Sequence, residues 1–132
     1  MLSGNITVSD IKYSDIAKED IKVKMSKIND AEILSPLTET SFYILISLMQ
    51  PLHGYGILKK IEEMTGGRII MGAGTLYGAI KNLLAGGLIV EVQSDSERRR
   101  NYRITEFGKE LVIKEMLRYE ELIRNARKMI EE

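Results

Sequence analysis

Apolar side chains recur every three or four residues in three short segments of this chain, a spacing that places them on one face of an α-helix. The predicted helices cover residues 36–50, 54–64 and 74–85. The first helix begins at Ser35–Pro36 or, with Thr38 as the rival N-cap, slightly later, and Pro51 ends it. A glycine pair follows each of the other two helices, as is typical of a helix end.

The same spacing predicts which side chains of the second and third helices point inward. In the second helix these are Leu58, Ile61 and Met64. The apolar face of the third helix consists of Leu76, Ile80, Leu83 and Leu84. A chain of 132 residues has room for one domain with a modest core, and these faces would form it.

Two stretches rich in β-branched and aromatic residues, 88–92 and 101–104, predict the strands of a β-hairpin. The polar loop between them, residues 93–100, ends in Arg98, Arg99 and Arg100. The hairpin should therefore carry a basic tip.

Thr105 can cap a long last helix that we expect to reach about Ile130. Its apolar residues are spaced four, three, four, three and four positions apart, which is the pattern of a coiled-coil seam. The seam consists of Val112, Met116, Tyr119, Ile123, Ala126 and Ile130. We expect a second copy of the chain to pack against it, because the domain is too small to cover it; packing on the chain's own domain or N-terminal arm is the alternative.

Three helices followed by a hairpin is the order of the winged-helix fold, in which the third helix enters the DNA major groove. The predicted fold class is therefore mainly α with a small β-hairpin, plus a long C-terminal dimerisation helix. Residues 36–104 form the predicted winged-helix DNA-binding domain, and residues 105–132 the dimerisation helix. Residues 1–35 form an N-terminal arm, either mobile or containing a short amphipathic helix.

The chain resembles the PadR-like family of transcriptional regulators over about residues 37–130. The motifs that carry this resemblance are His53–Gly54–Tyr55, Gly74–Thr75–Leu76–Tyr77, the segment 83–89, and Arg98–Thr105 with Gly108. The single C-terminal helix is similar to that of the small subfamily, which dimerises through it. The resemblance implies a homodimer that binds double-stranded DNA, usually as a repressor. Some members release DNA when a small aromatic effector binds, and others respond to no known ligand.

The net charge is zero, with 19 basic and 19 acidic residues, which by itself does not favour a nucleic-acid partner. The distribution changes this picture, because residues 51–104 hold eight basic residues against five acidic ones. The positive charge thus lies in the predicted DNA-binding domain.

Candidate DNA-binding residues lie on the second helix, the third helix and the hairpin. The resemblance implies that Gly74, Thr75 and Tyr77 lie near the DNA backbone. Lys81 and Asn82 have side chains that suit guanine and adenine edges. The Tyr55 hydroxyl and the three arginines are candidates for phosphate contacts, and Tyr77 can also serve in packing. His53 is best interpreted as structural, hydrogen-bonded to cap a helix.

Several classes of function find no support in the sequence. The chain has no cysteine, a single histidine and no phosphate-cradling motif, so we expect no catalytic residue, no cofactor and no metal site. No run of 18 apolar residues is present, so we expect no membrane partner. The first seven residues lack the basic start and the long apolar run of a secretory signal, and the absence of cysteine is compatible with a reducing compartment, so we expect a cytoplasmic location. The alternative to a DNA-binding regulator is a winged-helix protein-interaction module, which the zero net charge favours and the basic hairpin opposes.

Overall fold

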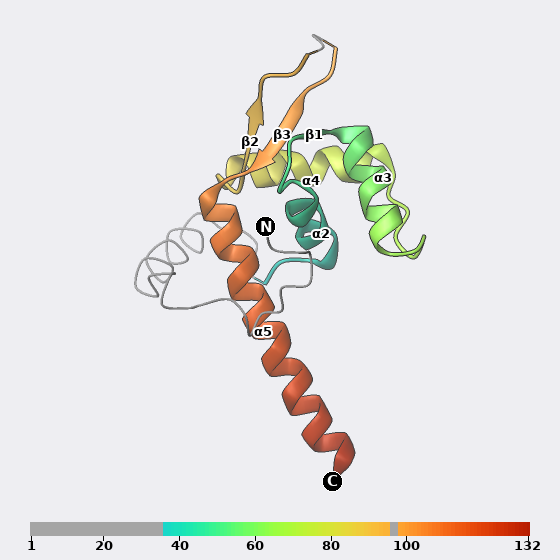
Figure 1. The fold of residues 1–132 in the computed structure, drawn as a ribbon, viewed down its shortest axis with the longest axis vertical. Helices are drawn as coiled ribbons and strands as arrows, with labels where there is room; N and C mark the ends of the chain where they lie inside the picture. The colour runs from blue at the N-terminus through green and yellow to red at the C-terminus, as the bar shows by residue number, and fades with distance from the viewer. Residues whose placement is uncertain (1–35, 96–97) are drawn as a thin grey trace, which may run out of the picture.

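The computed structural model describes residues 36–95 and 98–132, in which helices pack around a small antiparallel sheet (Figure 1). The elements are α2 Glu39–Ser47, β1 Leu52–His53, α3 Gly54–Met64, α4 Ala73–Ala85, β2 Ile89–Val92, β3 Asn101–Ile104 and α5 Glu106–Glu131. The prediction of a mainly α fold with a small β-hairpin and a long C-terminal helix is confirmed. The predicted arm over residues 1–35, and residues 96–97 of the predicted loop, lie outside the described residues.

The helix starts follow from local capping. Thr38 is the N-cap of α2, where its hydroxyl accepts a hydrogen bond from the N–H of Ser41 at 3.0 Å. The helix ends at Ser47, three residues before the predicted Gln50. The reason is a tertiary bond: the carbonyl of Leu48 leaves the helix direction and accepts from the N–H of Ile104 at 2.9 Å.

The sheet has three strands in the order β1-β3-β2, all antiparallel, and not only the two that the sequence predicts. β1 is two residues long and pairs with β3 so that Leu52 lies opposite Tyr102. On its other side Tyr102 lies opposite Glu91 of β2. The strand β1 therefore ties the start of α3 to the base of the hairpin.

A tight turn carries the chain from α4 into β2. Gly87 has a φ of 73°, the left-handed region that glycine enters without a steric cost. The N–H of Leu88 then bonds the carbonyl of Leu83 at 3.0 Å. Thr105 joins this corner to α5, because its hydroxyl accepts from the N–H of Gly108 at 3.0 Å and donates to the carbonyl of Gly87 at 2.7 Å. The prediction that Thr105 caps the last helix is confirmed.

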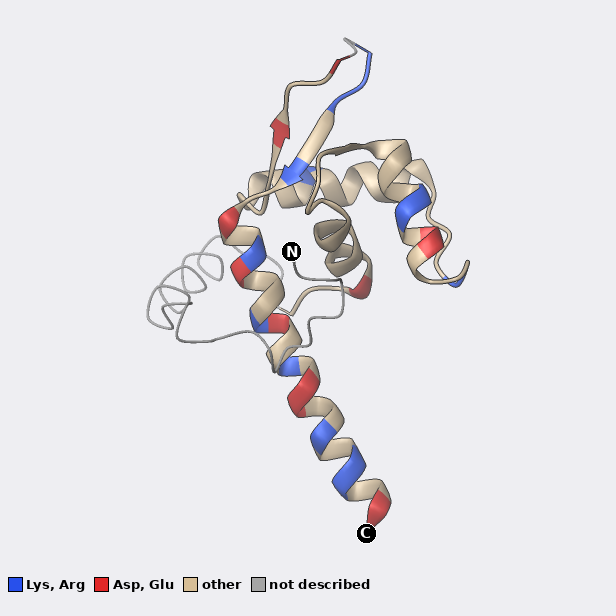
Figure 2. Ribbon diagram, in the orientation of Figure 1, with Lys and Arg blue, Asp and Glu red and all other residues tan. Residues whose placement is uncertain are grey.

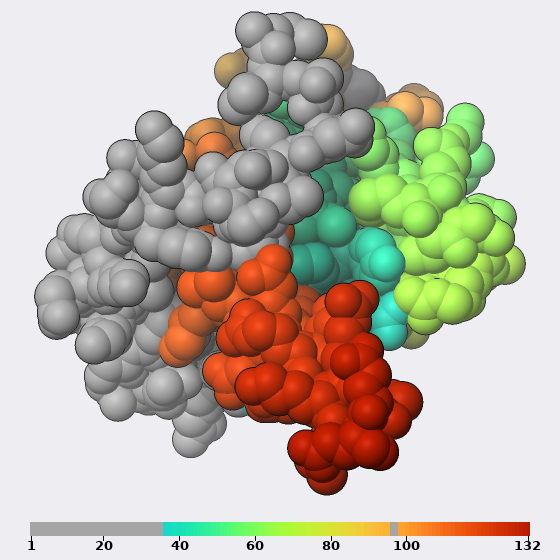
Figure 3. All heavy atoms as spheres, turned by 60° about the horizontal axis from the view of Figure 1, so that its bottom comes forward, coloured from blue at the N-terminus to red at the C-terminus, as the bar shows by residue number. Residues whose placement is uncertain are grey.

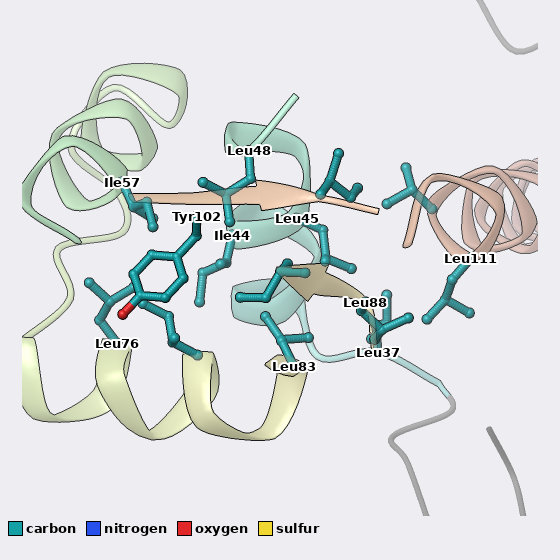
Figure 4. Close-up of a cluster of buried hydrophobic side chains, with 14 of the residues drawn as sticks. Leu37, Ile44, Leu45, Leu48, Ile57, Leu76, Leu83, Leu88, Tyr102 and Leu111 are labelled. Carbon is teal, nitrogen blue, oxygen red and sulfur yellow. The ribbon is translucent and has the colours of Figure 1, made fainter. Parts of the chain in front are cut away.

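One hydrophobic core joins helices α2 to α5 to the sheet (Figure 4). Its members are Leu37, Ile44, Leu45, Leu48, Ile57, Ile61, Leu76, Ile80, Leu83, Leu88, Ile89, Tyr102, Ile104, Leu111 and Val112. The prediction that Met64 and Leu84 point inward is wrong, because Met64 is 41% exposed and Leu84 is 38% exposed. Met64 is the last residue of α3, and Leu84 lies at the edge of the apolar face of α4, so the neighbouring elements cover neither side chain fully.

The helix α5 has two parts with different surroundings. Its first half packs on the domain, with Leu111 and Val112 buried in the core. From Glu121 onward every residue is exposed. Figure 3 shows these last turns, in red, standing out from the body of the domain.

Candidate nucleic-acid interface

The helix α4 presents one apolar and one exposed face. Leu76, Ile80 and Leu83 are buried, which turns the opposite side of the helix to solvent. The exposed residues include Gly74, Thr75, Tyr77, Lys81 and Asn82. All five of these predicted DNA-binding residues are therefore exposed to solvent on the surface of the domain.

The basic tip of the hairpin is exposed as well. Arg98, Arg99 and Arg100 follow one another on the limb that leads into β3 (Figure 2). Arg100 makes an ion pair with Glu91 across the hairpin, with Nε 3.4 Å from Oε1. This pair orients Arg100, but exposed pairs contribute little to stability.

His53 lies where β1 meets α3 and has two roles. As N-cap of α3, its Nδ1 accepts a hydrogen bond from the N–H of Gly56 at 3.1 Å. This confirms the interpretation of His53 as a helix-capping residue. Its other ring nitrogen, Nε2, lies 3.2 Å from Nη1 of Arg99. The sequence reasoning missed this second contact, because 46 residues separate the two side chains and only the β1–β3 pairing brings them together.

Two tyrosines flank this junction. The ring of Tyr55, which is 70% exposed, stacks on His53 with centroids 6.4 Å apart and planes at 13°. Tyr77, from α4, lies against the backbone of Gly54 and is still 52% exposed. Tyr77 therefore packs against α3 and also keeps about half of its surface open to a partner.

These side chains surround a hollow of about 260 Å³ between the hairpin and the start of α3. The lining residues are His53, Gly54, Tyr55, Tyr77, Arg98, Arg99, Arg100 and Tyr102. Burial raises the pKa of Tyr102, and the negative charge of Glu91 raises it further, so its hydroxyl stays protonated at neutral pH. The described lining thus contains three guanidinium groups and no carboxylate, which suits an anion.

Not all predicted residues come together at this hollow. Lys81 and Asn82 lie further along α4 and are absent from its described lining. They share the exposed face of α4 with Thr75 and Tyr77, which is where a base-reading role would place them.

The residues of the predicted seam separate into two groups. Val112 is 3% exposed, so it belongs to the domain's own core and offers no surface to another chain. This corrects its assignment to a dimer interface. Met116 packs against the same core, and Tyr119 meets Phe42 edge-on, with centroids 5.3 Å apart. Ile123, Ala126 and Ile130 are exposed and remain candidates for an interface.

A second, larger hollow of about 560 Å³ lies between α2 and α5. Its lining consists of Leu37, Glu39, Phe42, Tyr43, Ile46, Arg118 and Tyr119. Next to it, the buried carboxylate of Glu115 accepts from the N–H of Leu37 at 3.1 Å and from two nitrogens of Arg118 at 3.0 and 2.9 Å. Burial would raise the pKa of Glu115, but these hydrogen bonds and the charge of Arg118 together lower it.

Two further findings bear on the class of function. Within residues 36–95 and 98–132, no group of three His, Asp or Glu side chains is arranged to hold a metal ion. Over the same described ranges, no helix combines the length and the apolar character needed to cross a membrane.

Comparison with known proteins gives a match to a family of transcriptional regulators. A family model described as the transcriptional regulator PadR-like family matches residues 43–114. A segment of 90 residues is 36% identical to a 37.1 kDa protein of transposon TN4556 from Streptomyces fradiae, and covers 67% of this chain. The chain spans only 23% of the length of that relative.

Solved structures share the fold. A PadR family transcriptional regulator from Eggerthella lenta superposes with a TM-score of 0.60 at 22% identity, over 86% of this chain and 95% of that one. A transcriptional regulator from Clostridium thermocellum superposes with a TM-score of 0.51 at 26% identity, over 70% of this chain and 89% of that one.

Proposed function

Because the chain belongs to the PadR-like family of transcriptional regulators, we propose that it is a sequence-specific repressor that binds duplex DNA as a homodimer. The family confirms the predicted resemblance and the prediction that the chain is a regulator and not an enzyme. The repressor role, the dimer and the effector are the parts that we propose.

One observation carries the proposal: Tyr77, on the exposed face of α4, lines the same hollow as the three arginines of the hairpin. A helix that enters the major groove needs cations beside it where the phosphates pass. Arg98, Arg99 and Arg100 would supply these cations, and Lys81 and Asn82 would read base edges.

The exposed end of α5 supports the homodimer. Leu122, Ile123, Met129 and Ile130 expose large apolar surfaces on one extended helix, and such a stripe is typical of a helix that packs against a partner. Two chains joined through it would present two copies of α4. A separation of about 34 Å between them matches successive major grooves, so the operator is expected to be nearly palindromic.

The hollow between α2 and α5 supports a small aromatic effector. Phe42, Tyr43 and Tyr119 give it aromatic walls, and it adjoins the helix that we propose for dimerisation. A ligand seated there would bias the position of α5 on the domain, and so the distance between the two copies of α4.

Duplex binding across a salt series tests the DNA-binding proposal. Wild type is compared with Arg98→Ala/Arg99→Ala/Arg100→Ala, and the log–log salt slope is expected to fall by about 0.9 for each phosphate that the variant no longer neutralises. The matched control is Lys114→Ala/Arg124→Ala/Lys128→Ala, which removes three exposed cations from α5 and should leave the slope unchanged. If wild type binds no duplex at low salt, the proposal is wrong and the protein-interaction module becomes the better interpretation.

A further inference from the structure

The two ring nitrogens of His53 face two groups that both donate hydrogen bonds. Nδ1 lies 3.1 Å from the backbone N of Gly56, which carries a proton that it can only donate. Nε2 lies 3.2 Å from Nη1 of Arg99, and a guanidinium also only donates. A neutral imidazole has one accepting nitrogen, so it cannot accept both bonds.

The N-cap decides which nitrogen accepts. The Gly56 N–H is one of the first free N–H groups of α3, and the capping bond to Nδ1 satisfies it. With Nδ1 accepting, the ring proton must lie on Nε2. Nε2–H and the Arg99 guanidinium then point their donors into the same hollow, and neither can accept from the other.

We propose that His53 and Arg99 together bind one phosphate of the DNA backbone, which would accept from both donors at once. This inference rests on the proposed function and assigns a ligand-binding role to His53 beyond helix capping. A phosphodiester oxygen carries the negative charge that Arg99 needs and the lone pairs that both donors need. The Tyr77 ring, Arg98 and Arg100 bound the same hollow, and the carboxylate of Glu91, which pairs with Arg100, is not part of its described lining.

The fold explains how two distant residues reach one phosphate. His53 pairs with Asn101 in the β1–β3 ladder, and Arg99 lies two residues before Asn101 on the same limb of the hairpin. The ladder thus fixes the hairpin relative to the start of α3. A phosphate bound here would contact the hairpin and the second helix together, which sets the position of α4 in the groove.

The first test reads the tautomer of His53 directly. The chain has one histidine, so a long-range ¹H–¹⁵N correlation spectrum of the full chain shows the imidazole nitrogens without ambiguity. At about pH 8, where an ordinary histidine is neutral, the expected result is a proton on Nε2. On adding a duplex selected by the protein from a random-sequence library, the Nε2 nitrogen resonance should shift as its proton gains an acceptor. A proton on Nδ1 would overturn the proposal, and so would an Nε2 signal that bound duplex leaves unmoved.

The second test uses variants on both sides of the proposed phosphate. His53→Asn keeps a capping side chain but is too short to reach the phosphate, and should weaken duplex binding about tenfold with an unchanged salt slope, because the donor that it removes is neutral. Arg99→Gln, which leaves the cap intact, should lower the slope by about 0.9. The double variant should lose less affinity than the product of the two single effects, because both groups bind one phosphate.

A methylphosphonate scan of the selected duplex completes the test. Replacing one particular phosphate in each half-site should weaken wild type and leave the double variant unaffected. Suppose that wild type binds the duplex, but the affinity losses of the two single variants simply multiply in the double variant, or every methylphosphonate weakens wild type and the double variant equally. The proposal of a shared phosphate is then wrong, and the DNA-binding proposal stands. If wild type binds no duplex, both proposals fail together.

Discussion

The side chain of Tyr77 on α4 lies directly against the backbone of Gly54 on α3, so closely that a Cβ at position 54 would overlap its hydroxyl and come within 2.9 Å of its Cζ. The two helices thus meet through a ring that has no room for a larger residue beneath it. Glycine at position 54 lets the ring lie close to α3 at the edge of the proposed DNA surface.

The substitution Gly54→Ala should therefore displace the Tyr77 ring. We expect duplex affinity to fall, while the free energy of unfolding changes by no more than about 1 kcal/mol, because alanine favours the helix over glycine by a similar amount. Urea unfolding and duplex titration measure the two quantities.

The control for that experiment is the same Gly54→Ala substitution in a variant that lacks the Tyr77 ring. In a Tyr77→Ala background, Gly54→Ala should have no further effect on duplex affinity, because the overlap no longer exists. An equal reduction in both backgrounds would show that residue 54 acts on DNA binding by some other route.

The buried carboxylate of Glu115 should make stability depend on pH. Its pKa is lowered in the folded chain, so its contribution is complete above the ordinary value of 4.5 and is lost as the pH falls through the lower folded value. Glu115→Gln should cost about 1 kcal/mol near neutral pH and progressively less below that ordinary value. Urea unfolding of wild type and variant at about pH 7 and about pH 3 measures the difference between their free energies of unfolding at each pH. A difference of the same size at both pH values would show that the contribution of Glu115 to stability does not depend on its negative charge.

Thr105 ties the end of the hairpin to the start of α5. Thr105→Val keeps the shape but removes the hydroxyl that caps α5 and bonds the carbonyl of Gly87, so we expect the free energy of unfolding to fall by about 1 kcal/mol. Thr105→Ser keeps the hydroxyl and should stay within a few tenths of wild type. Urea midpoints at constant m-value compare the three proteins. An equal reduction in the serine variant would point to the methyl group instead.

The exposed end of α5 tests the homodimer. In Ile123→Glu/Ile130→Glu each position loses the burial of an isoleucine, about 1.5 to 3 kcal/mol, so the dimer Kd should rise by at least on the order of 100-fold. Both residues are exposed, so the fold of the single chain should survive. Sedimentation velocity measures the change in mass.

Its matched control places the same charges on the other side of the helix. Arg124→Glu/Lys128→Glu puts two glutamates away from the apolar stripe and should leave the mass unchanged. If both double variants remain dimers, the interface lies elsewhere on the chain.

Local signals in the sequence predict most of the fold. Thr105, the glycine pairs and the helical spacing of apolar residues act within a few positions, so the bounds of α3 match the prediction at Gly54 and Met64. β1 could not be found in this way, because two residues show no periodicity and only pairing with β3 defines them. The contact between His53 and Arg99 depends on that pairing and was hidden for the same reason.

The seam on α5 shows another limit of sequence reasoning. A regular apolar stripe indicates that something covers it, and not which surface does so. Val112 and Met116 are covered by the chain's own core, whereas Ile123 and Ile130 are not. The two groups are separated by where the domain ends along α5: α2 reaches Tyr119 through Phe42, and the residues beyond Glu120 are exposed.

The helix α5 is continuous from the core to its exposed end, and this makes it a lever. Its 26 residues span roughly 39 Å, and its fixed end shares a core with Leu76 and Leu83 of α4. A tilt of about 10° at the fixed end would move the far end by roughly 7 Å. In the proposed dimer the lever works in reverse as well. The far ends would be held together, so a small rearrangement around Glu115 and Arg118 would swing each DNA-binding surface through a distance comparable to the width of a groove.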